Sequence, residues 1–584
     1  MFLSMVSKIR TFGWVQNPGK FENLKRVVQV FDRNSKVHNE VKNIKIPTLV
    51  KESKIQKELV AIMNQHDLIY TYKELVGTGT SIRSEAPCDA IIQATIADQG
   101  NKKGYIDNWS SDGFLRWAHA LGFIEYINKS DSFVITDVGL AYSKSADGSA
   151  IEKEILIEAI SSYPPAIRIL TLLEDGQHLT KFDLGKNLGF SGESGFTSLP
   201  EGILLDTLAN AMPKDKGEIR NNWEGSSDKY ARMIGGWLDK LGLVKQGKKE
   251  FIIPTLGKPD NKEFISHAFK ITGEGLKVLR RAKGSTKFTR VPKRVYWEML
   301  ATNLTDKEYV RTRRALILEI LIKAGSLKIE QIQDNLKKLG FDEVIETIEN
   351  DIKGLINTGI FIEIKGRFYQ LKDHILQFVI PNRGVGTKQL VKSELEEKKS
   401  ELRHKLKYVP HEYIELIEIA RNPTQDRILE MKVMEFFMKV YGYRGEHLGG
   451  SRKPDGAIYT VGSPIDYGVI VDTKAYSGGY NLPIGQADEM QRYVEENQTR
   501  NKHINPNEWW KVYPSSVTEF KFLFVSGHFK GNYKAQLTRL NHITNCNGAV
   551  LSVEELLIGG EMIKAGTLTL EEVRRKFNNG EINF

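Results

Sequence analysis

An acidic residue and a lysine interrupt an apolar stretch late in the chain. Residues 467–476 read Tyr-Gly-Val-Ile-Val-Asp-Thr-Lys-Ala-Tyr, a β-branched run that predicts a buried strand. Residues two apart on a strand share a face, so Asp472 and Lys474 point to one side and Thr473 to the other. A charge in an apolar strand is costly unless it is paired or binds a metal. This strand therefore predicts a functional site.

The preceding segment supplies a partner for these charges. A second short strand starts at Pro454-Asp455 and ends near residue 461. If the hairpin folds about Ser463 and Pro464, Asp455 falls opposite Asp472, with the Cβ atoms about 5 Å apart. A hard divalent cation would relieve the repulsion between two such carboxylates. A one-residue slip of this register would separate them.

The pattern of Pro-Asp, spacer and Asp-x-Lys resembles the motif of the PD-(D/E)xK nucleases. The short tripeptide alone is weak, because Glu363-Ile-Lys365 also fits it. Pro259-Asp260 is a second Pro-Asp pair, but polar residues follow it, and we interpret it as a turn. Spacing and strand context favour 454–474 as the catalytic pair, with a surface ion pair as the alternative.

Composition and charge narrow the class of protein. The 584 residues predict about four domains, and the ordinary globular composition leaves ample core. Two distant cysteines, Cys88 and Cys546, form no metal or disulfide pattern, which favours a reducing cytoplasm. No apolar run reaches the length of a membrane helix, and the N-terminus has no adequate signal sequence.

The excess of positive charge lies in the larger N-terminal part. Residues 389–584 contain 26 basic and 26 acidic residues, whereas residues 1–388 contain 57 and 47. A basic surface there favours a polyanion such as DNA, although a merely soluble basic protein is the simpler alternative.

Internal repeats support DNA binding. The segments at 110–124 and 226–244 each place a tryptophan, Trp117 or Trp237, four residues before Leu-Gly, and each has a matching tail, Phe-Val-Ile-Thr-Asp-Val-Gly or Phe-Lys-Ile-Thr-Gly-Glu-Gly. A weaker third copy covers 355–371. Each unit predicts a helix stopped by Gly and then two short strands, the pattern of a winged helix. The helix at 343–358 is acidic, so we expect the third copy to make mainly protein contacts.

The N-terminal ends of the recognition helices are the candidates for base contacts. Asn reads adenine, Lys guanine and Glu cytosine. Two loops before the first helix carry further donors. For each residue the alternative is helix capping, which is common for Asn, Asp and Ser. The candidates are Gln16, Asn17, Arg83, Asn108, Trp109, Asn221, Asn222, Glu224 and Lys229.

The C-terminal part predicts a separate α/β domain. Residues 381–392 have the composition of a linker, and Ser393 with Glu396 predicts a capping box for the next helix. Helical patterns at 411–421 and 425–441 precede the two motif strands, and a helix at 485–498 and strands at 520–525 and 548–552 follow. This is the order of a restriction-endonuclease-like core. We leave Glu430 and Glu435 unassigned, because the helix rotation is unknown.

The predicted fold is therefore multidomain α+β. It comprises three winged-helix (helix-turn-helix-like) DNA-recognition subdomains and a C-terminal restriction-endonuclease-like α/β nuclease domain. The expected divisions are 1–150, 151–290, 291–380, the linker 381–392 and the nuclease domain 393–584.

Over its whole length the chain resembles the type IIS restriction endonucleases. The resemblance implies a bacterial, cytoplasmic enzyme that binds a short asymmetric duplex sequence and cuts both strands at a fixed distance outside it, leaving 5′-phosphates. It also implies Mg²⁺ dependence and a partner DNA methyltransferase. By the same resemblance Asp455, Asp472 and the Thr473 carbonyl would hold Mg²⁺, while Lys474 would orient or deprotonate the attacking water.

One catalytic motif per chain hydrolyses one phosphodiester at a time, so we expect two nuclease domains to pair on DNA. Asp488 and Arg492 lie four apart on the 485–498 helix and could meet their counterparts across a two-fold axis. An intrahelical ion pair is the alternative. Two other functions stay open: a winged-helix regulator with an inactive nuclease-like dimerisation domain, and a structure-selective repair nuclease.

Overall fold

The computed structural model describes residues 10–100, 102–253, 261–285, 289–302, 307–376, 378–381, 390–462 and 464–584. The expected turns at Ser463 and at Pro259-Asp260 lie outside these residues. The chain forms two compact units. The first comprises residues 1–190, 229–248 and 267–392, and the second comprises residues 191–228, 249–266 and 393–584.

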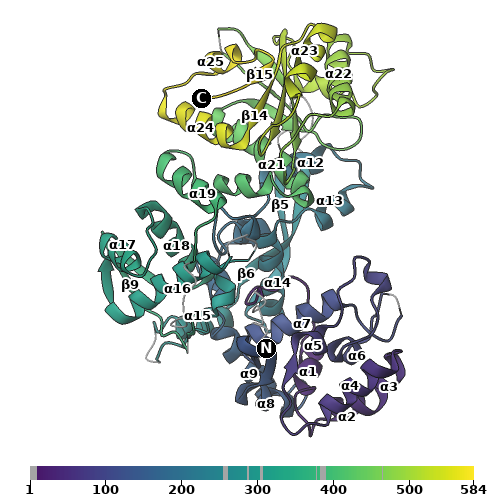
Figure 1. Ribbon diagram of the computed structural model, residues 1–584, viewed down its shortest axis with the longest axis vertical. Helices are drawn as coiled ribbons and strands as arrows, with labels where there is room; N and C mark the ends of the chain where they lie inside the picture. The colour runs from purple at the N-terminus through teal and green to yellow at the C-terminus, as the bar shows by residue number, and fades with distance from the viewer. Residues whose placement is uncertain are drawn as a thin grey trace, which may run out of the picture. The chain divides into compact units, whose positions relative to one another are not determined.

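Each of the three predicted copies contains a small three-stranded sheet with helices, as a winged helix requires. Helices of all three copies are labelled in Figure 1. In the first, the sheet order is β1-β3-β2, and Asp107 caps the long helix by accepting a hydrogen bond from Ser110 N (2.6 Å). The elements of this copy are β1 (Tyr70–Thr71), α5 (Tyr72–Val76), α7 (Asn108–Ala120), β2 (Ile124–Ile127) and β3 (Ser132–Ile135).

The other two copies have sheet orders β4-β6-β5 and β7-β9-β8. The second contains β4 (Leu179–Thr180), α11 (Lys181–Gly185), α14 (Ser226–Lys240), β5 (Val244–Ile253) and β6 (Asn261–Ile271). The third contains β7 (Ser326–Lys328), α17 (Ile329–Lys338), α18 (Ile345–Thr358), β8 (Ile362–Lys365) and β9 (Phe368–Leu371).

The repeated sequence signals have clear physical causes. The matching tryptophans Trp117 and Trp237 are fully buried and stack on each other, with ring centroids 4.7 Å apart. In the repeated tail, Thr136 caps α8 (Asp137–Lys144) by accepting from the N–H of Gly139 (3.0 Å). A Cβ on Gly139 would lie 1.9 Å from the Phe123 carbonyl oxygen, so only glycine fits there. Thr272 and Gly275 repeat this arrangement at α15 (Gly273–Ala282).

The acidic residues of the third copy are partly neutralised inside the fold. Asp351 on α18 accepts hydrogen bonds from Arg313 Nε (2.6 Å) and Arg314 Nε (2.7 Å), and Glu343 accepts from Arg313 Nη1 (3.0 Å). All four side chains are almost fully buried. Two of the acids that gave this helix its acidic character therefore stabilise the core instead of forming an acidic surface.

The C-terminal domain is built on a six-stranded mixed sheet of order β10-β11-β12-β13-β14-β15. The first three strands are antiparallel and the last four are parallel. The two edge strands, β10 and β15, were not predicted from the sequence. The strands are β10 (Arg444–His447), β11 (Gly456–Tyr459), β12 (Tyr467–Lys474), β13 (Glu519–Ser526), β14 (Gly548–Ser552) and β15 (Gly580–Glu581).

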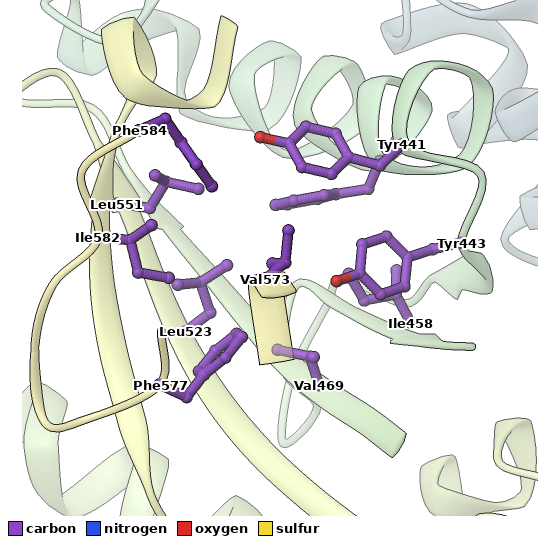
Figure 2. Close-up of a pocket in the computed structure, with 11 residues that line it drawn as sticks. Tyr441, Tyr443, Ile458, Val469, Leu523, Leu551, Val573, Phe577, Ile582 and Phe584 are labelled. Atoms are coloured by element: carbon purple, nitrogen blue, oxygen red, sulfur yellow. The ribbon is translucent and has the colours of Figure 1, made fainter. Parts of the chain in front are cut away.

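Helices cover both faces of this sheet. Strand alternation sends Ala457, Ile470 and Phe522 into a core with α22 (Ile484–Thr499) and α23 (Tyr533–Thr544). The opposite face carries Ile458, Val469 and Leu523, which surround a small apolar pocket together with residues from the other helices (Figure 2). The elements that contribute to this pocket include η8 (Phe437–Tyr441), α25 (Leu570–Arg575) and the C-terminus.

The helices before the motif differ in detail from the prediction. The segment expected as a helix over 411–421 is a 3-10 helix, His411–Glu415, followed by α20 (Leu416–Ile419). The helix expected at 425–441 is α21 (Asp426–Phe436), which continues into the π-helical turn η8.

The expected capping box at Ser393 is only half formed. Ser393 caps α19 (Glu394–Lys405) by accepting from Glu396 N. The Glu396 side chain does not return a bond to the cap, because it pairs with Arg403 (2.9 Å).

Within the described residues, no single helix is long and apolar enough to cross a membrane. One bent pair, Ala150–Ser161 with Pro164–Leu172, meets the length and composition requirements when its two helices are taken together.

Candidate active site and nucleic-acid interface

The β11–β12 pairing has the predicted register. Gly456 pairs with Val471, and Tyr459 pairs with Gly468. Continuing this register by one step places Asp455 opposite Asp472. Both lie on the sheet face that also carries Ala457 and Ile470.

Hydrogen bonds hold the two carboxylates in place. Asp455 Oδ2 accepts from the Thr473 backbone N (2.6 Å) and from Thr473 Oγ1 (3.0 Å). On the neighbouring strand, Lys474 Nζ lies 2.7 Å from Asp472 Oδ2. The side chains of Asp472 and Lys474 are only 11 % and 21 % exposed, so the ion pair is largely shielded from water. Two carboxylates and one ammonium therefore gather on one face of the hairpin.

The electrostatics of the pair favour a bound cation. Burial, and then the charge of Asp472, raise the pKa of Asp455 well above its usual value. Burial also raises the pKa of Asp472, although Lys474 opposes this effect. Burial by itself lowers the pKa of Lys474, but the charges of Asp472 and Asp455 outweigh it and raise the pKa above the ordinary lysine value. Without a cation, the two acids resist ionising together, and the lysine stays protonated.

Two further acids act on this site: Glu430, which the sequence analysis left unassigned, and Glu489, which it did not consider. The charge of Glu430 on α21 raises the pKa of Asp455 and Asp472, and that of Glu489 on α22 raises the pKa of Asp472. Glu430 Oε2 lies 3.4 Å from Nε2 of the buried His447. In contrast, Glu435 pairs with Lys439 (2.5 Å). The rotation of α21 about its axis determines which of the two glutamates faces the site, and sequence periodicity alone does not give this rotation.

The donor set suits a hard divalent cation. The two facing carboxylates, together with a backbone carbonyl such as that of Thr473, are oxygen ligands of the type that Mg²⁺ and Ca²⁺ prefer. In the part of the chain that the structure describes, no group of three or more His, Cys, Asp or Glu side chains is arranged to hold a metal.

The competing tripeptide is a surface ion pair. Glu363 and Lys365 lie on β8, with Lys365 Nζ 3.2 Å from Glu363, and Lys372 pairs with the same carboxylate at 3.0 Å. The hydrogen bonds from these two lysines lower the pKa of Glu363, the reverse of the shift at Asp455.

In the first recognition copy, several candidates lie near the start of α7. The Trp109 ring is 55 % exposed, and the Arg83 guanidinium carbon lies 5.1 Å from the ring centroid. Arg83 Nε lies 4.0 Å from Asp107 Oδ2. Asn108 Oδ1 is buried and has no hydrogen-bond partner among the described residues. An exposed aromatic ring with a cation beside it is chemistry suited to nucleic acid.

The other candidates are placed less uniformly. Asn17 is exposed, whereas Gln16 is half-buried and hydrogen-bonds to Tyr230. Asn221 and Asn222 end α13 (Lys216–Asn222), and their side chains lie outside the described part of the structure.

The last two candidates lie close together in sequence. Glu224 is buried, and Lys229 is half-buried in the first turn of α14.

The two predicted dimer residues do not pair with each other within α22. Asp488 forms an ion pair with Arg539 of α23, while Arg492 lies 3.6 Å from Glu489 and 3.9 Å from Glu496. Both side chains are about half exposed. The simple intrahelical pair that was the alternative interpretation is therefore wrong.

Comparison with known proteins covers almost the whole chain. Four FokI family descriptions match in order: recognition-domain subdomain 1 (10–145), subdomain 2 (152–287), the D3 domain (300–367) and the cleavage domain (392–583). The type II restriction enzyme StsI of Streptococcus sanguinis is 30% identical over 96% of this chain and 94% of its own.

Solved structures give a closer match. A structure of restriction endonuclease FokI is 97% identical, with a TM-score of 0.94. A structure of FokI bound to DNA is 98% identical, with a TM-score of 0.96. Each covers 99% of this chain and all of the other.

Proposed function

This chain belongs to the FokI family of type IIS restriction endonucleases, and we propose that Asp455, Asp472 and Lys474 are the residues with which it hydrolyses DNA. It is a type II site-specific deoxyribonuclease that acts on double-stranded DNA and depends on a divalent metal. One observation carries the assignment of residues: the half-buried Asp455 and the buried Asp472 lie opposite each other where β11 pairs with β12, and a lysine lies 2.7 Å from Asp472.

Magnesium is the metal that this donor set fits best. Asp455, Asp472 and the Thr473 carbonyl would hold it, because small hard cations select oxygen ligands. A bound Mg²⁺ supplies Lewis-acid polarisation of the scissile phosphate and a lower pKa for the attacking water.

The chain's own residues prepare the site. The two hydrogen bonds from Thr473 fix Asp455, so that its carboxylate faces Asp472 before DNA arrives. Because its pKa is raised, Lys474 carries a proton and a positive charge at neutral pH. It is therefore suited to stabilise the extra negative charge of the pentacovalent phosphate, and to orient the water from the Asp472 side. Proton removal by Lys474 would require neutralisation of the two acids first.

Removing the three side chains tests this assignment. Asp455→Ala, Asp472→Ala and Lys474→Ala are each expected to abolish cutting while leaving binding to the recognised DNA intact. Glu363→Ala and Lys365→Ala are matched controls, because they remove a carboxylate and a lysine from the other acid-x-lysine tripeptide, on a surface strand, and are expected to cut normally. A near-normal cutting rate in any of the first three variants would show the assignment to be wrong.

The position of the cuts tests the type of nuclease. Plasmid is incubated with the protein and Mg²⁺, and the ends are sequenced. We expect 5′-phosphate ends at a constant spacing from one short asymmetric word. Absence of cuts would indicate an inactive regulator, and scattered cuts would indicate a structure-selective repair nuclease.

Recognition of this word is assigned to the first two winged helices. The exposed Trp109 with Arg83 beside it supports the first, together with Gln16, Asn17 and Asn108. Asn221, Asn222, Glu224 and Lys229 are the corresponding candidates in the second. Substituting a base-reading residue relaxes specificity at one base pair, whereas substituting a residue that contacts phosphate weakens binding to all DNA sequences equally. Binding to a set of single-base variants of the word separates the two roles.

Cutting both strands calls for two nuclease domains, since each chain carries one catalytic pair. We assign the pairing surface to α22, where Asp488 and Arg492 are half exposed and so accessible to a second copy. The double-strand cutting rate is expected to rise more steeply than in proportion to enzyme concentration. A strictly first-order dependence would contradict the pairing.

The domain division and the cellular setting follow from the same function. We assign residues 1–150, 151–290 and 291–380 to the three recognition subdomains, 381–392 to the linker and 393–584 to the nuclease. A restriction enzyme acts where foreign DNA arrives, which is the bacterial cytoplasm, and the two buried free cysteines suit that compartment. Host DNA with the same word needs protection, so a cognate DNA methyltransferase is the expected functional partner.

A further inference from the structure

The loop that leads into Asp455, residues 448–455, is a hairpin connection. It joins β10 to β11, and the pairing of His447 with Gly456 closes it. The N–H groups of Leu448 and Gly449 both donate to the Asp455 carbonyl oxygen, at 2.9 and 3.3 Å. These bonds fix the base of the loop. The tip includes Arg452, three residues before Asp455, which has a left-handed backbone with φ of 61°.

A second loop, within residues 500–509, forms hydrogen bonds with this tip. Asn505 is fully buried, and its Nδ2 donates to the Arg452 carbonyl oxygen (2.9 Å). The Arg452 guanidinium Nη2 donates back to the Ile504 carbonyl oxygen (2.8 Å). The other end of the Asn505 amide is also occupied, because Oδ1 accepts from Asn507 N (3.0 Å). We call the reciprocal contact of Arg452 with Ile504 and Asn505 the clasp.

Hydrogen bonds to Glu496 attach the clasp to α22. Nδ2 of Asn505 donates its second hydrogen bond to Glu496 Oε2 (2.8 Å). The same oxygen accepts from Trp509 Nε1 (2.8 Å), so Glu496 ties the middle and the end of the 500–509 segment to the helix. The Glu496 side chain is only 2 % exposed. A charged acceptor buried in this way makes strong hydrogen bonds, and the position of Asn505 is therefore well defined.

We propose that Asn505 is a positioning residue for the metal site, because it pins the Arg452 backbone and so sets where Asp455 points relative to Asp472. This inference rests on the proposed function. A metal ligand has to be held within about 0.5 Å of its productive position, and residues behind the ligands usually do this. Thr473 fixes the Asp455 carboxylate from the strand side. Asn505 fixes the Arg452 backbone from the loop side.

The predicted consequence is a defect in metal binding and not in DNA binding. Without the Asn505 donor, the loop tip can leave its left-handed conformation, and the Asp455 backbone gains freedom. If the two carboxylates spend less time facing each other, they bind a cation more weakly. Loss of an outer-shell partner typically weakens metal affinity about 10-fold or more. Saturating metal then restores most of the cutting rate.

The experiment compares Asn505→Asp and Asn505→Ala with the unchanged protein. The aspartate keeps an oxygen for Asn507 N but loses the donor to Arg452 and places a second carboxylate against Glu496. Asn583→Asp is the matched control, since it makes the same chemical change at an exposed position of the nuclease domain. The full-length protein is bound to a duplex that carries its recognised word, and Ca²⁺ is titrated in by calorimetry. Mg²⁺ dependence of cutting is measured in parallel.

We expect both Asn505 variants to raise the Ca²⁺ Kd and the half-saturating Mg²⁺ about 10-fold, with cutting at saturating Mg²⁺ within about 3-fold of normal. DNA affinity and the control variant are expected to be unchanged. If the Asn505 variants unfold, Arg452→Gly provides the test instead. Arg452 is exposed, and glycine increases the backbone freedom of the loop tip and removes the hydrogen bond from Arg452 to the Ile504 carbonyl. It is expected to raise the Ca²⁺ Kd, and an unchanged Kd overturns the inference.

Asp455→Ala separates the two possible failures. If it loses Ca²⁺ binding while the Asn505 variants bind normally, the positioning role is wrong and the proposed site stands. If Asp455→Ala itself binds Ca²⁺ normally, the proposed metal site is wrong. A loss of cutting in the Asn505 variants that saturating Mg²⁺ does not restore would also overturn the inference, because it would place the defect outside metal binding.

Discussion

The hydroxyl of Thr473 offers a small change at the centre of the site. Thr473→Val replaces the hydroxyl with a methyl group of nearly the same size and keeps the β-branched shape that suits a strand. It removes the bond from Oγ1 to Asp455 Oδ2 (3.0 Å) and leaves the stronger backbone bond to the same oxygen (2.6 Å). The backbone carbonyl that we assign to the metal is unaffected.

The size of the effect follows from the loss of one bond to a charged acceptor. Such a bond contributes about 1.5–3 kcal/mol, and we take the lower end because the backbone bond remains. The loss destabilises the ionised form of Asp455, whose pKa is already raised by burial. A cation binds the ionised form, so about 1.5 kcal/mol corresponds to an increase of about 10-fold in the half-saturating Mg²⁺ concentration.

Cleavage of a plasmid over a series of Mg²⁺ concentrations at fixed pH measures this change. Calorimetric Ca²⁺ titration of the DNA-bound protein provides the same information without cutting. Thr538→Val is the control, because its hydroxyl bonds only to a carbonyl of its own helix, at Lys534. A Thr473→Val protein with normal metal dependence would refute the argument that this hydroxyl holds Asp455 in its ionised form.

Three further predictions concern pH and stability. The folded-state pKa values of Asp455 and Asp472 lie above their unfolded values, so the metal-free protein loses stability as pH rises through the titration of these two acids. Binding of Ca²⁺ restores that stability. The half-saturating Mg²⁺ concentration for cutting falls over the same pH range. Thermal unfolding with and without Ca²⁺ across pH measures this, and a pH-independent effect of Ca²⁺ would contradict it. Val573→Ile adds one methylene to the apolar pocket of Figure 2, and should stabilise the nuclease domain by about 0.8 kcal/mol, or about 2 °C, without altering cleavage. A lower melting temperature would show that the pocket has no room for the group. Asp351→Asn removes the carboxylate that accepts from both Arg313 and Arg314, while Arg313 keeps its pair with Glu343, and the change is expected to cost the third recognition copy about 3–5 kcal/mol in chemical denaturation. An unchanged midpoint would mean that the network contributes little to stability.

Local sequence was enough to predict the β11–β12 hairpin and the residues that share its face. The alternation of Val469 and Val471 with Ile470 and Asp472 fixes which side chains share a face. The register was an assumption, that the hairpin folds about Ser463 and Pro464, and the pairing of Gly456 with Val471 confirms it. The winged helices were predictable for similar reasons, since their threonine caps and glycines act within a few residues of the chain.

Residues that act across large sequence separations could not be predicted. The position of Glu430 beside the site depends on how α21 packs on the sheet. The apolar pattern of this helix is equally compatible with Glu430 or Glu435 facing the site. Asp488 pairs with Arg539, 51 residues away, and not with its helical neighbour Arg492. Long side chains on a surface helix choose among several partners, and the choice depends on which element packs alongside.

The amino-acid sequence by itself determined the order of domains, the kind of chemistry and the pairing of Asp455 with Asp472, because each depends on short-range periodicity and turns. The tertiary structure decided what surrounds that pair. Asn505 is separated from Arg452 by 53 residues, and only folding of the 500–509 segment against α22 brings its amide to that loop. The reason is physical: a hydrogen bond between distant segments forms only when the core beneath both has packed.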